Sequence, residues 1–514
     1  MEYLSLSSSE GVPDYKITPL LRDSLIIRKV DNKKIIEVAR TEVSKTEVMD
    51  YLNAFKERHP DAQTSYIEKS QLMEHLQKGG FYSDDASKSD MQGQVIDILR
   101  AAVNKRATDV HIRVGNDFTL VKFRIDKVLV NFEEYSAEKG KALVYCLYQT
   151  MCEGNSNQTF SETKSVEANI DEEFVKELGL SGGRLSSRPT DEKVLVVIRL
   201  LKKRERALTL RELGMNDYQC SVIERVTAIP SGVVLLSGPT NSGKSTLAQS
   251  MIEMVTTRHP GLHFITVEDP IENNIRGAVQ TPLAIADRSN KELMGRAWGD
   301  AIENLVRLDP DQMFIGEIRG EHSATGCISA AQTGRKVYTT IHTDYPVDII
   351  ARLKALSVDT DLLTNASLIV CLIGQRTAPL LCEHCKEPYS VVKNTLSQQD
   401  KRVIEQFCLP ESVFLQRQNG CEKCNYTGTR GMTGIYEIIE TTVDFMRIYH
   451  EEGKMKAYEY WYRHGGETLC ANLIELINSG KISPIYAHHN VCNLDRDERM
   501  FSGHIRKQKE EHSS

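Results

Sequence analysis

A glycine-rich segment, GPTNSGKS, carries the clearest chemistry in this sequence. Gly238, Gly243, Lys244 and Ser245 occupy the fixed positions of the pattern G-x-x-x-x-G-K-[ST]. In that pattern, backbone N–H groups and the positive end of the following helix surround phosphate groups. The lysine reaches the β- and γ-phosphates, and the Ser245 hydroxyl is placed to bind Mg²⁺. The expected nucleotide-binding residues are Gly238, Pro239, Thr240, Asn241, Ser242, Gly243, Lys244, Ser245 and Thr246.

The surroundings of this loop support the same interpretation. An apolar run, GVVLL, precedes the loop and indicates a strand, and STLAQSMIEMV follows it and indicates a helix. Asn241 stands in the middle of the loop, where a left-handed backbone conformation would favour glycine. Because Asn is the next most tolerant residue in that conformation, we expect its cost to be small.

Polar residues also end three later apolar runs. FITVEDPIE carries Glu268 with two further acids, MFIGE ends on Glu317, and VYTTIHTD places His342 at its end. Ligands bind beyond the carboxyl ends of strands in parallel α/β sheets, so these side chains should converge on the phosphate loop. Many phosphate-loop proteins that hydrolyse nucleotides carry an Asp–Glu pair at this point, and here Gly316 replaces the Asp. Glu317 is therefore the candidate that would orient or activate a water for attack on the γ-phosphate. His342 is a candidate γ-phosphate sensor, and the alternative for each residue is a solvated acid or a buried histidine.

Two CxxC pairs form a second chemical feature. Cys382 and Cys385 are separated by 35 residues from Cys421 and Cys424. Two such knuckles present four thiolates to one Zn²⁺, and four protein ligands indicate a structural site. A redox CxxC is the alternative, although two pairs without a thioredoxin-like context disfavour it. We expect most of the other eight cysteines to be small buried hydrophobic residues.

The central part of the chain, which must position these residues, alternates strands and helices. This alternation predicts an α/β fold with a parallel sheet. Near the N-terminus the pattern predicts two strands within 24–40, a helix within 45–60 and a polar linker over 82–94. The expected units are an N-terminal module (1–85), a second α+β domain (92–203), an α/β domain (208–450) containing a zinc lobe at about 376–436, and C-terminal helices with a polar tail (451–514).

Composition limits the classes of function. The chain has 514 residues, with 64 Lys and Arg against 71 Asp and Glu, so its net charge is −7. This balance disfavours a nucleic acid as the main partner. No segment approaches the ~18 apolar residues that span a bilayer, and the N-terminus lacks the basic and apolar regions of a signal peptide. We expect a cytoplasmic protein that partners hold at a membrane.

Taken together, the motifs resemble those of the hexameric ATPases of type II secretion and type IV pilus assembly. That family carries a phosphate loop, an Asp box, a Walker B strand and a His box, matched here by GPTNSGKST, TVEDPIE, RLDPDQMFIGEIRG and TTIHTD. The resemblance extends over about 107–480. GCEKCNYTG and the following TGTRGMTGIYE resemble the zinc-bearing lobe of the assembly and secretion members, which the retraction members usually lack.

The resemblance implies a RecA-like motor domain, an α+β (PAS-like) second N-terminal domain and a zinc-binding insertion. It implies ATP, Mg²⁺ and Zn²⁺ as cofactors, a homo-hexamer, an inner-membrane platform protein and a membrane-associated docking protein as partners, and peripheral association with the inner membrane. Arginines of the second domain reach the nucleotide in this family; Arg184 matches one such position and Arg188 matches less well. The family's Q-D-G-R segment has no recognisable counterpart. The catalytic candidates are therefore Glu317, Glu268, His342 and Arg184.

Three other functions remain open at this stage. One is a pilus retraction ATPase, which the zinc lobe and the long N-terminus disfavour. Another is a nucleic-acid-stimulated P-loop motor, which the negative charge and the lack of basic-aromatic strips disfavour. The third is a scaffold that binds nucleotide without hydrolysing it.

Overall fold

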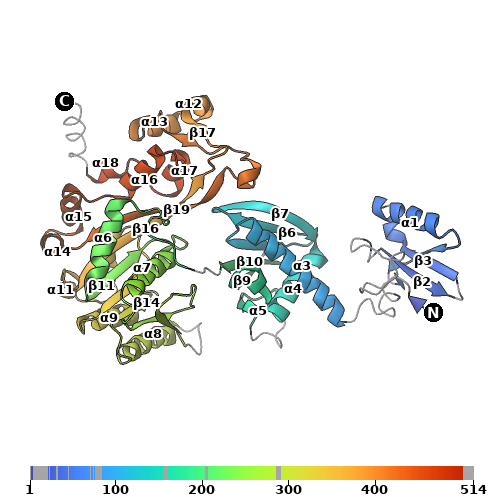
Figure 1. Cartoon of the computed structure of the whole chain (residues 1–514), viewed down its shortest axis with the longest axis horizontal. Coiled ribbons are helices and arrows are strands. Elements are labelled where there is room, and N and C mark those ends of the chain that lie inside the picture. The colour runs from blue at the N-terminus through green and yellow to red at the C-terminus, as the bar shows by residue number, and fades with distance from the viewer. Residues whose placement is uncertain are drawn as a thin grey trace.

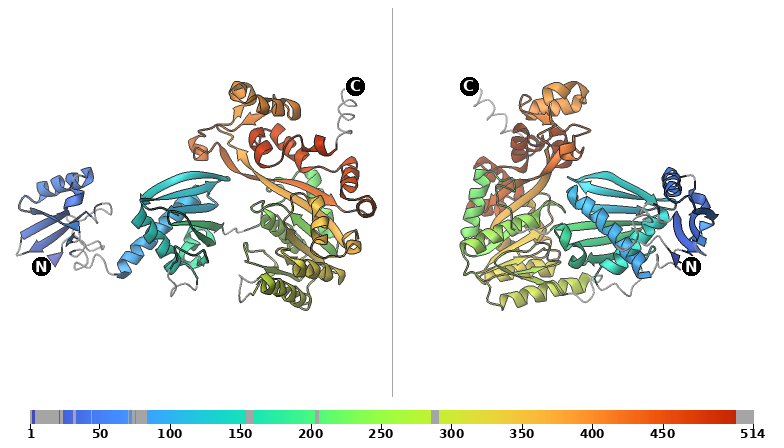
Figure 2. Two further views of the ribbon diagram at one scale, coloured as in Figure 1. Left: turned by 180° about the vertical axis from the view of Figure 1, so that it is seen from behind. Right: turned by 45° about the vertical axis from the view of Figure 1, so that its right-hand side comes forward.

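The computed structural model arranges the chain as three bodies in a row, with the N-terminal module at one end and the motor domain at the other (Figure 1). A view from behind and a view turned by 45° show the same order (Figure 2). The structure describes residues 2–3, 21, 24–30, 33–43, 45–69, 71–72, 75, 84–153, 160–202, 206–284 and 291–501. Residues 203–205 of the charged segment before the motor domain and residues 502–514 of the expected tail lie outside these ranges.

The N-terminal module has a four-stranded sheet in the order β1-β2-β3-β4. The predicted strand pair is present, because β2 and β3 run antiparallel, and β4 joins β3 in parallel. The predicted helix is present as well and ends before Pro60. The elements are β1 (Glu2–Tyr3), β2 (Leu25–Val30), β3 (Lys33–Ala39), α1 (Thr46–Arg58) and β4 (Gln63–Ile67).

The second domain is an antiparallel sheet in the order β7-β6-β5-β10-β9-β8, with α3 and α4 packed against it. Its elements are α3 (Asp84–Asn104), β5 (Asp109–Val114), β6 (Phe118–Ile125), β7 (Val128–Ser136), α4 (Ala137–Met151), β8 (Val166–Ile170), α5 (Glu172–Val175), β9 (Leu180–Pro189) and β10 (Val194–Lys202). The prediction of a linker over 82–94 was wrong for most of its length, because α3 already begins at Asp84. Polar residues there form the first turns of the helix whose later face, from Val95 onward, enters the core.

The motor domain is built on a seven-stranded sheet in the order β13-β12-β14-β15-β11-β16-β19. Every neighbouring pair is parallel except β16 and β19, so the predicted parallel α/β sheet is confirmed. Its elements are α6 (Asp217–Ala228), β11 (Gly232–Ser237), α7 (Lys244–Arg258), β12 (Phe264–Glu268), β13 (Ala278–Pro282), α8 (Lys291–Val306), β14 (Gln312–Ile315), α9 (Glu321–Gln332), β15 (Lys336–Ile341), α10 (Ile349–Lys354), α11 (Thr360–Leu363), β16 (Ile369–Leu381) and β19 (Thr429–Glu440).

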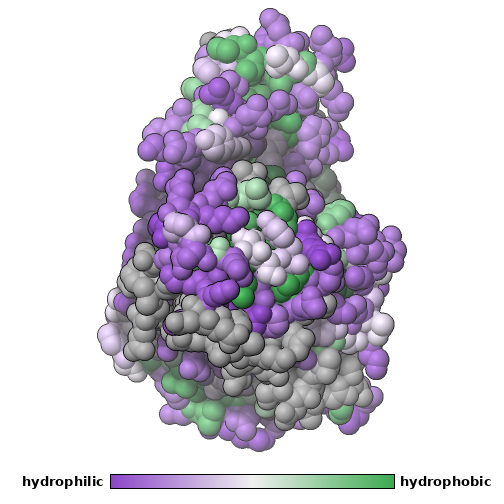
Figure 3. Space-filling view, turned by 90° about the vertical axis from the view of Figure 1, so that its right-hand side faces the viewer, coloured by the Kyte–Doolittle hydropathy of each residue, from purple (hydrophilic) through white to green (hydrophobic). Residues whose placement is uncertain are grey.

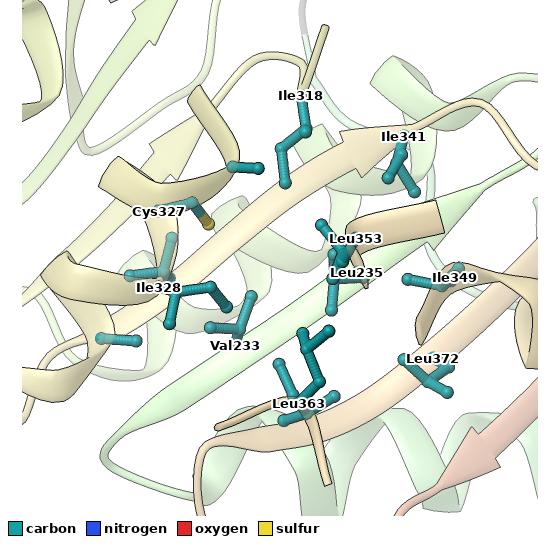
Figure 4. Packing of buried hydrophobic residues seen from close by; sticks show 14 of the residues in the cluster. Val233, Leu235, Ile318, Cys327, Ile328, Ile341, Ile349, Leu353, Leu363 and Leu372 are labelled. Carbon is teal, nitrogen blue, oxygen red and sulfur yellow. The ribbon is translucent and has the colours of Figure 1, made fainter. Parts of the chain in front are cut away.

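Strand β11 explains why the segment before the phosphate loop is continuously apolar. Val233 and Leu235 face one core with Cys327 and Ile328 of α9, as Figure 4 shows. Val234 and Leu236 face the opposite core, which α6 and α7 cover. A central strand of a parallel sheet is buried on both faces, so side chains on both sides are apolar.

A lobe and a set of helices complete the chain beyond β16. The lobe between β16 and β19 holds β17 (Glu387–Pro388), α12 (Tyr389–Val392), α13 (Gln398–Phe407) and β18 (Phe414–Leu415). The C-terminal helices are α14 (Val443–Glu451), α15 (Lys454–Arg463), α16 (Leu469–Asn478), α17 (Pro484–Asn490) and α18 (Arg496–Met500). Among the described residues, no helix combines the length and the apolar composition that crossing a bilayer requires.

Candidate functional site

The phosphate loop leaves β11 and enters α7 with the backbone geometry that its glycines allow. Gly238 has φ 148° and Gly243 has φ 88°. A Cβ at Gly238 would lie 2.3 Å from the backbone oxygen of Gln375, so this position excludes any side chain. Asn241 has φ 63°, the left-handed conformation in which Asn is tolerated.

Lys244 begins α7 and is buried within the loop. Its Nζ donates hydrogen bonds to the backbone oxygens of Gly238 at 2.8 Å and Pro239 at 3.1 Å. Burial lowers the pKa of the Lys244 amine, and the negative charges of Glu317 and Glu272 oppose this shift. The two acids therefore lie close enough to act on the lysine electrostatically; Glu317 follows β14, and Glu272 lies in the segment after β12.

Buried polar atoms gather around this loop. The side-chain oxygens of Ser237, Ser242, Thr339 and Gln375 are buried and have no hydrogen-bond partner among the described residues. Ser237, Thr339 and Gln375 come from the neighbouring strands β11, β15 and β16. Because buried polar groups are nearly always hydrogen-bonded, such a cluster fits a site that binds a polar ligand and its water.

Glu317 and His342 meet at the ends of β14 and β15. His342 Nε2 lies 3.0 Å from Glu317 Oε1, and the other carboxylate oxygen, Oε2, accepts a hydrogen bond from Arg319 Nε at 3.0 Å. Arg319 also lies 3.5 Å from Asp269, measured between its NH1 atom and Asp269 Oδ2. The side chain of Glu317 is 24% exposed and that of His342 is 46% exposed, so solvent reaches both groups.

Glu268 ends β12 but faces a different neighbour. Its Oε1 accepts hydrogen bonds from Thr266 Oγ1 at 2.7 Å and Gln280 Nε2 at 2.8 Å. Burial raises the pKa of Glu268, and the two hydrogen bonds oppose that shift. The carboxyl group is thus fixed between β12 and β13, in contrast with the solvent-accessible Glu317.

Arg184 lies on β9 of the second domain. Its guanidinium forms an ion pair with Glu167 of the adjacent strand at 3.0 Å, and its side chain is 42% exposed. Among the described residues it makes no hydrogen bond or ion pair with the motor domain. The structure therefore does not bring Arg184 together with the other three catalytic candidates.

The four cysteines of the two CxxC pairs form one cluster at the end of the β16–β19 arm. All four Sγ atoms lie within 4.8 Å of one another, and three of the residues are buried. Backbone N–H groups of Cys421 and Gly428 donate to Cys424 Sγ at 3.1 and 3.2 Å. Burial raises the pKa of Cys424, but these donors outweigh it and lower the pKa to about 6. Four converging sulfurs with thiolate-stabilising donors fit a tetrahedral metal site.

Comparison with known proteins identifies the family. The model of the family described as "Type II/IV secretion system protein" matches residues 84–494, which is most of the chain. The chain belongs to this family. The match includes the phosphate loop, the three polar strand ends and both cysteine pairs, so the family predicted from the sequence motifs is confirmed.

Relatives cover most of the chain as well. The type II secretion system ATPase E of Vibrio cholerae is 28% identical over 486 residues, which span 91% of this chain and 89% of the relative. The type II secretion system protein E of Pseudomonas aeruginosa is 28% identical over 72% of this chain and 70% of its own. Among solved structures, the ADP-bound pilus retraction motor PilT has a TM-score of 0.52 at 21% identity, covering 78% of this chain and 98% of its own. The ATPase DotB of Legionella pneumophila also scores 0.52, at 18% identity over 75% and 91%. These structures support the fold.

Two residues of the site were not among the sequence candidates. Arg319 connects Glu317 to Asp269, and its position directly after the GEI segment was an available signal. Gln375 lines the phosphate loop from β16; a Cβ at Gly243 would lie 2.9 Å from its Nε2. Only the parallel pairing of β11 with β16 reveals that contact, because 132 positions separate the two residues (375 − 243).

Proposed function

We propose that this protein is an ATP-hydrolysing motor that powers assembly of a type II secretion pseudopilus or a type IV pilus. The observation that carries the proposal is the placement of Glu317 and His342 at the ends of β14 and β15, next to a complete phosphate loop. Membership of the secretion family supports it. A binding module would need the loop but not a solvent-accessible acid beside it.

The residues around the loop fit ATP and Mg²⁺. Backbone N–H groups of Gly238–Thr246 would bind the phosphates, Lys244 would neutralise the β- and γ-phosphates, and Ser245 would hold Mg²⁺. Bound Mg²⁺ supplies charge neutralisation of the transferred phosphoryl group. The side-chain oxygens of Ser237, Ser242 and Gln375, which have no partner within the described part of the chain, offer polar contacts for nucleotide and ordered water.

Glu317 would orient the attacking water and accept its proton, because its carboxylate is held but not buried. Arg319 fixes one carboxylate oxygen, and His342 fixes the other, from which position the histidine would detect the γ-phosphate. Glu268 would act indirectly, since it is buried and its Oε1 is held between Thr266 and Gln280. Arg184 is paired with Glu167 on the second domain, and that domain would have to move before Arg184 met the nucleotide.

The cysteine cluster fits Zn²⁺, held by Cys382, Cys385, Cys421 and Cys424. Four protein sulfurs leave no open coordination position, so the role would be structural and the metal would join the two ends of the lobe. A redox function is less favoured, because all four sulfurs converge on one point.

Further properties follow from the family resemblance. We infer a homo-hexamer, a PAS-like second domain, an inner-membrane platform protein as the moved partner, and peripheral attachment to the inner membrane through a docking protein that binds the N-terminal module. The end of the molecule that carries this module is largely hydrophilic with small hydrophobic patches (Figure 3). The retraction function is not better supported, because the likeness to PilT at 21% identity concerns the fold alone, whereas a type II secretion ATPase matches 91% of the chain. Nucleic-acid stimulation remains disfavoured by the net charge of −7.

The test is Glu317→Gln, which keeps the shape of the side chain and removes its basicity. We expect ATP turnover to fall at least about 10²-fold while the affinity for ATP changes less than about twofold. Glu303→Gln, on the exposed face of α8, is the matched control. If the Glu317 variant retained most of its turnover, the proposed role of Glu317 would be wrong. If the wild-type protein showed no turnover even with its platform protein, the scaffold alternative would be favoured.

A further inference from the structure

The turn between β6 and β7 of the second domain has an unusual residue in an unusual conformation. Asp126 has φ 45° and Lys127 has φ 70°, so both central residues of this two-residue turn are left-handed. Such turns favour Asn or Asp followed by Gly. A lysine at the second position carries a conformational cost that glycine would avoid. Its side chain therefore needs another explanation.

Both residues of the turn contact the motor domain. Lys127 Nζ donates to the backbone oxygen of Thr377 on β16 at 2.6 Å. Asp126 Oδ2 accepts from Thr429 Oγ1 and from the N–H of Gly431 on β19, each at 3.3 Å. Figure 1 shows this end of β7 beside β19, and the rotated view in Figure 2 agrees. The turn thus binds two adjacent strands of the arm that carries the cysteine cluster.

The burial of the two residues differs in a way that separates their roles. Asp126 is 7% exposed, and Arg106 of its own domain lies 3.7 Å from the same carboxylate oxygen. Lys127 and its hydrogen bond to Thr377 are exposed, although burial and the nearby charge of Arg376 lower the pKa of its amine to about 8. Asp126 therefore forms the packed part of the contact. Lys127 is a peripheral side chain that can be changed without opening a core.

Thr377 connects this contact to the phosphate loop. Its Oγ1 donates to the backbone oxygen of Asn241 at 3.4 Å, and its methyl group lies 3.6 Å from the place where a Cβ of Gly243 would be. The backbone oxygen of Thr377 thus accepts a hydrogen bond from Lys127 of the second domain, while the side chain of Thr377 contacts the phosphate loop. A single residue of β16 therefore contacts both the second domain and the phosphate loop.

We propose that the Asp126–Lys127 turn is an intramolecular docking element for the motor domain and that Lys127 is a positioning residue for the phosphate loop. When the turn is docked, Thr377 and Asn241 are held in the arrangement that binds ATP. When the second domain moves away, the loop loses this support. The role of Lys127 in positioning the phosphate loop rests on the proposed ATP hydrolysis, whereas the docking of the turn on the motor domain does not.

The experiment uses the full-length protein with three substitutions at one position. Lys127→Met removes the amine, Lys127→Arg keeps a cationic donor, and Lys127→Gly removes the side chain while relieving the left-handed backbone. Lys122→Met, on the strand β6 that leads into the turn, is the control; its amine makes no hydrogen bond with the motor domain among the described residues. The measurements are kcat and KM for ATP, thermal stability, and hydrogen exchange of the Gly431 amide.

We expect the Met and Gly variants to raise KM for ATP about three- to tenfold and to change kcat less than about twofold, corresponding to one lost charge-assisted hydrogen bond at a partly exposed site. Exchange at Gly431 should accelerate at least about threefold in both. The Arg variant should restore KM and exchange. A purely structural lysine would instead show a lower melting temperature with no change in KM, and the Gly variant would then behave at least as well as wild type.

Besides a lower melting temperature with unchanged KM, two outcomes would overturn the proposal. One is wild-type KM and wild-type exchange in both the Met and Gly variants. The other is protection of Gly431 that appears only at protein concentrations where the chain assembles, because the contact would then come from a neighbouring subunit. If the wild-type protein hydrolysed no ATP, the proposed function would fail while the exchange measurement still decided whether the turn docks.

Discussion

A lysine buried in the motor core offers a prediction whose magnitude follows from its surroundings. Lys336 begins β15, is 0% exposed, and donates from Nζ to the backbone oxygen of Val226 at 2.9 Å. Burial lowers the pKa of its amine from 10.5 to about 8, and Cys371 opposes the shift. Lys336 lies at the opposite end of β15 from His342, so changing it leaves the candidate site intact.

Lys336→Met removes this buried charge and keeps an unbranched side chain of similar length. A pKa displaced from 10.5 to about 8 costs the folded state about 3 kcal/mol at pH 7, at roughly 1.4 kcal/mol per unit. The lost hydrogen bond from a charged donor offsets about 1.5–3 kcal/mol of that. The backbone oxygen of Val226 keeps a second hydrogen bond, from the N–H of Ile229 at 3.3 Å. At pH 7 we expect the free energy of unfolding of the variant to equal that of the wild type or to exceed it by up to about 2 kcal/mol.

The pH dependence gives a sharper result. Between pH 8 and pH 10.5 the unfolded chain binds a proton at Lys336 that the folded chain has released, so the free energy of unfolding rises with pH. Across this range, the free energy of unfolding of the wild type should therefore rise by about 3 kcal/mol relative to that of the Met variant. Urea unfolding followed by tryptophan fluorescence measures it, since both tryptophans, Trp298 and Trp461, lie in one core with the motor sheet.

Lys354→Met, on the exposed side of α10, should show no pH-dependent difference from wild type. A difference between wild type and Lys336→Met that stayed constant from pH 7 to pH 10.5 would show that the amine is neutral or well solvated in the folded protein. A destabilisation of more than about 2 kcal/mol at pH 7 would show that its hydrogen bond outweighs its desolvation.

Two further predictions concern the loop and the cysteine cluster. Because Asn241 has φ 63°, Asn241→Gly should change ADP affinity less than about twofold, whereas the β-branched Asn241→Val should weaken it about tenfold, measured by titration with a fluorescent nucleotide; equal affinities in both variants would contradict the backbone argument. Protein purified without chelator should contain one zinc per chain by metal analysis, and removing it should lower the melting temperature while ADP binding persists. Well under one zinc per chain would sink the structural-zinc hypothesis.

The features of this structure that the sequence predicted correctly depend on local patterns. The phosphate loop follows from a fixed spacing between a strand and a helix, and α1 follows from apolar periodicity ended by Pro60. The CxxC spacing likewise indicated one cluster. Strand ends that share a sheet edge could be expected to converge, and Glu317 and His342 do lie together.

What sequence reasoning missed depends on contacts between distant segments. Nothing in FITVED shows that Gln280 of β13 occupies the carboxyl group of Glu268, because that contact requires the parallel pairing of β12 with β13. The docking of Lys127 on Thr377 joins positions 250 residues apart. The linker over 82–94 was misread because a polar composition marks a solvated helix as well as a loop.

Strand packing also explains why the motor strand carries glycine before its acid. The N–H of Gly316 donates to the backbone oxygen of Val267 on β12 at 2.8 Å. A Cβ at Gly316 would lie 3.2 Å from that same oxygen and 3.3 Å from the Glu268 Cα, so an aspartate there would push β12 and β14 apart. The close approach of the two strands thus disfavours a carboxylate at 316, where β12 or β14 would have to shift by a few tenths of an ångström, and leaves Glu317, one position further on, as the solvent-accessible acid. Magnesium would then depend on Ser245, water and the phosphates, which makes the polar atoms around the loop part of the catalytic arrangement and not only of nucleotide affinity.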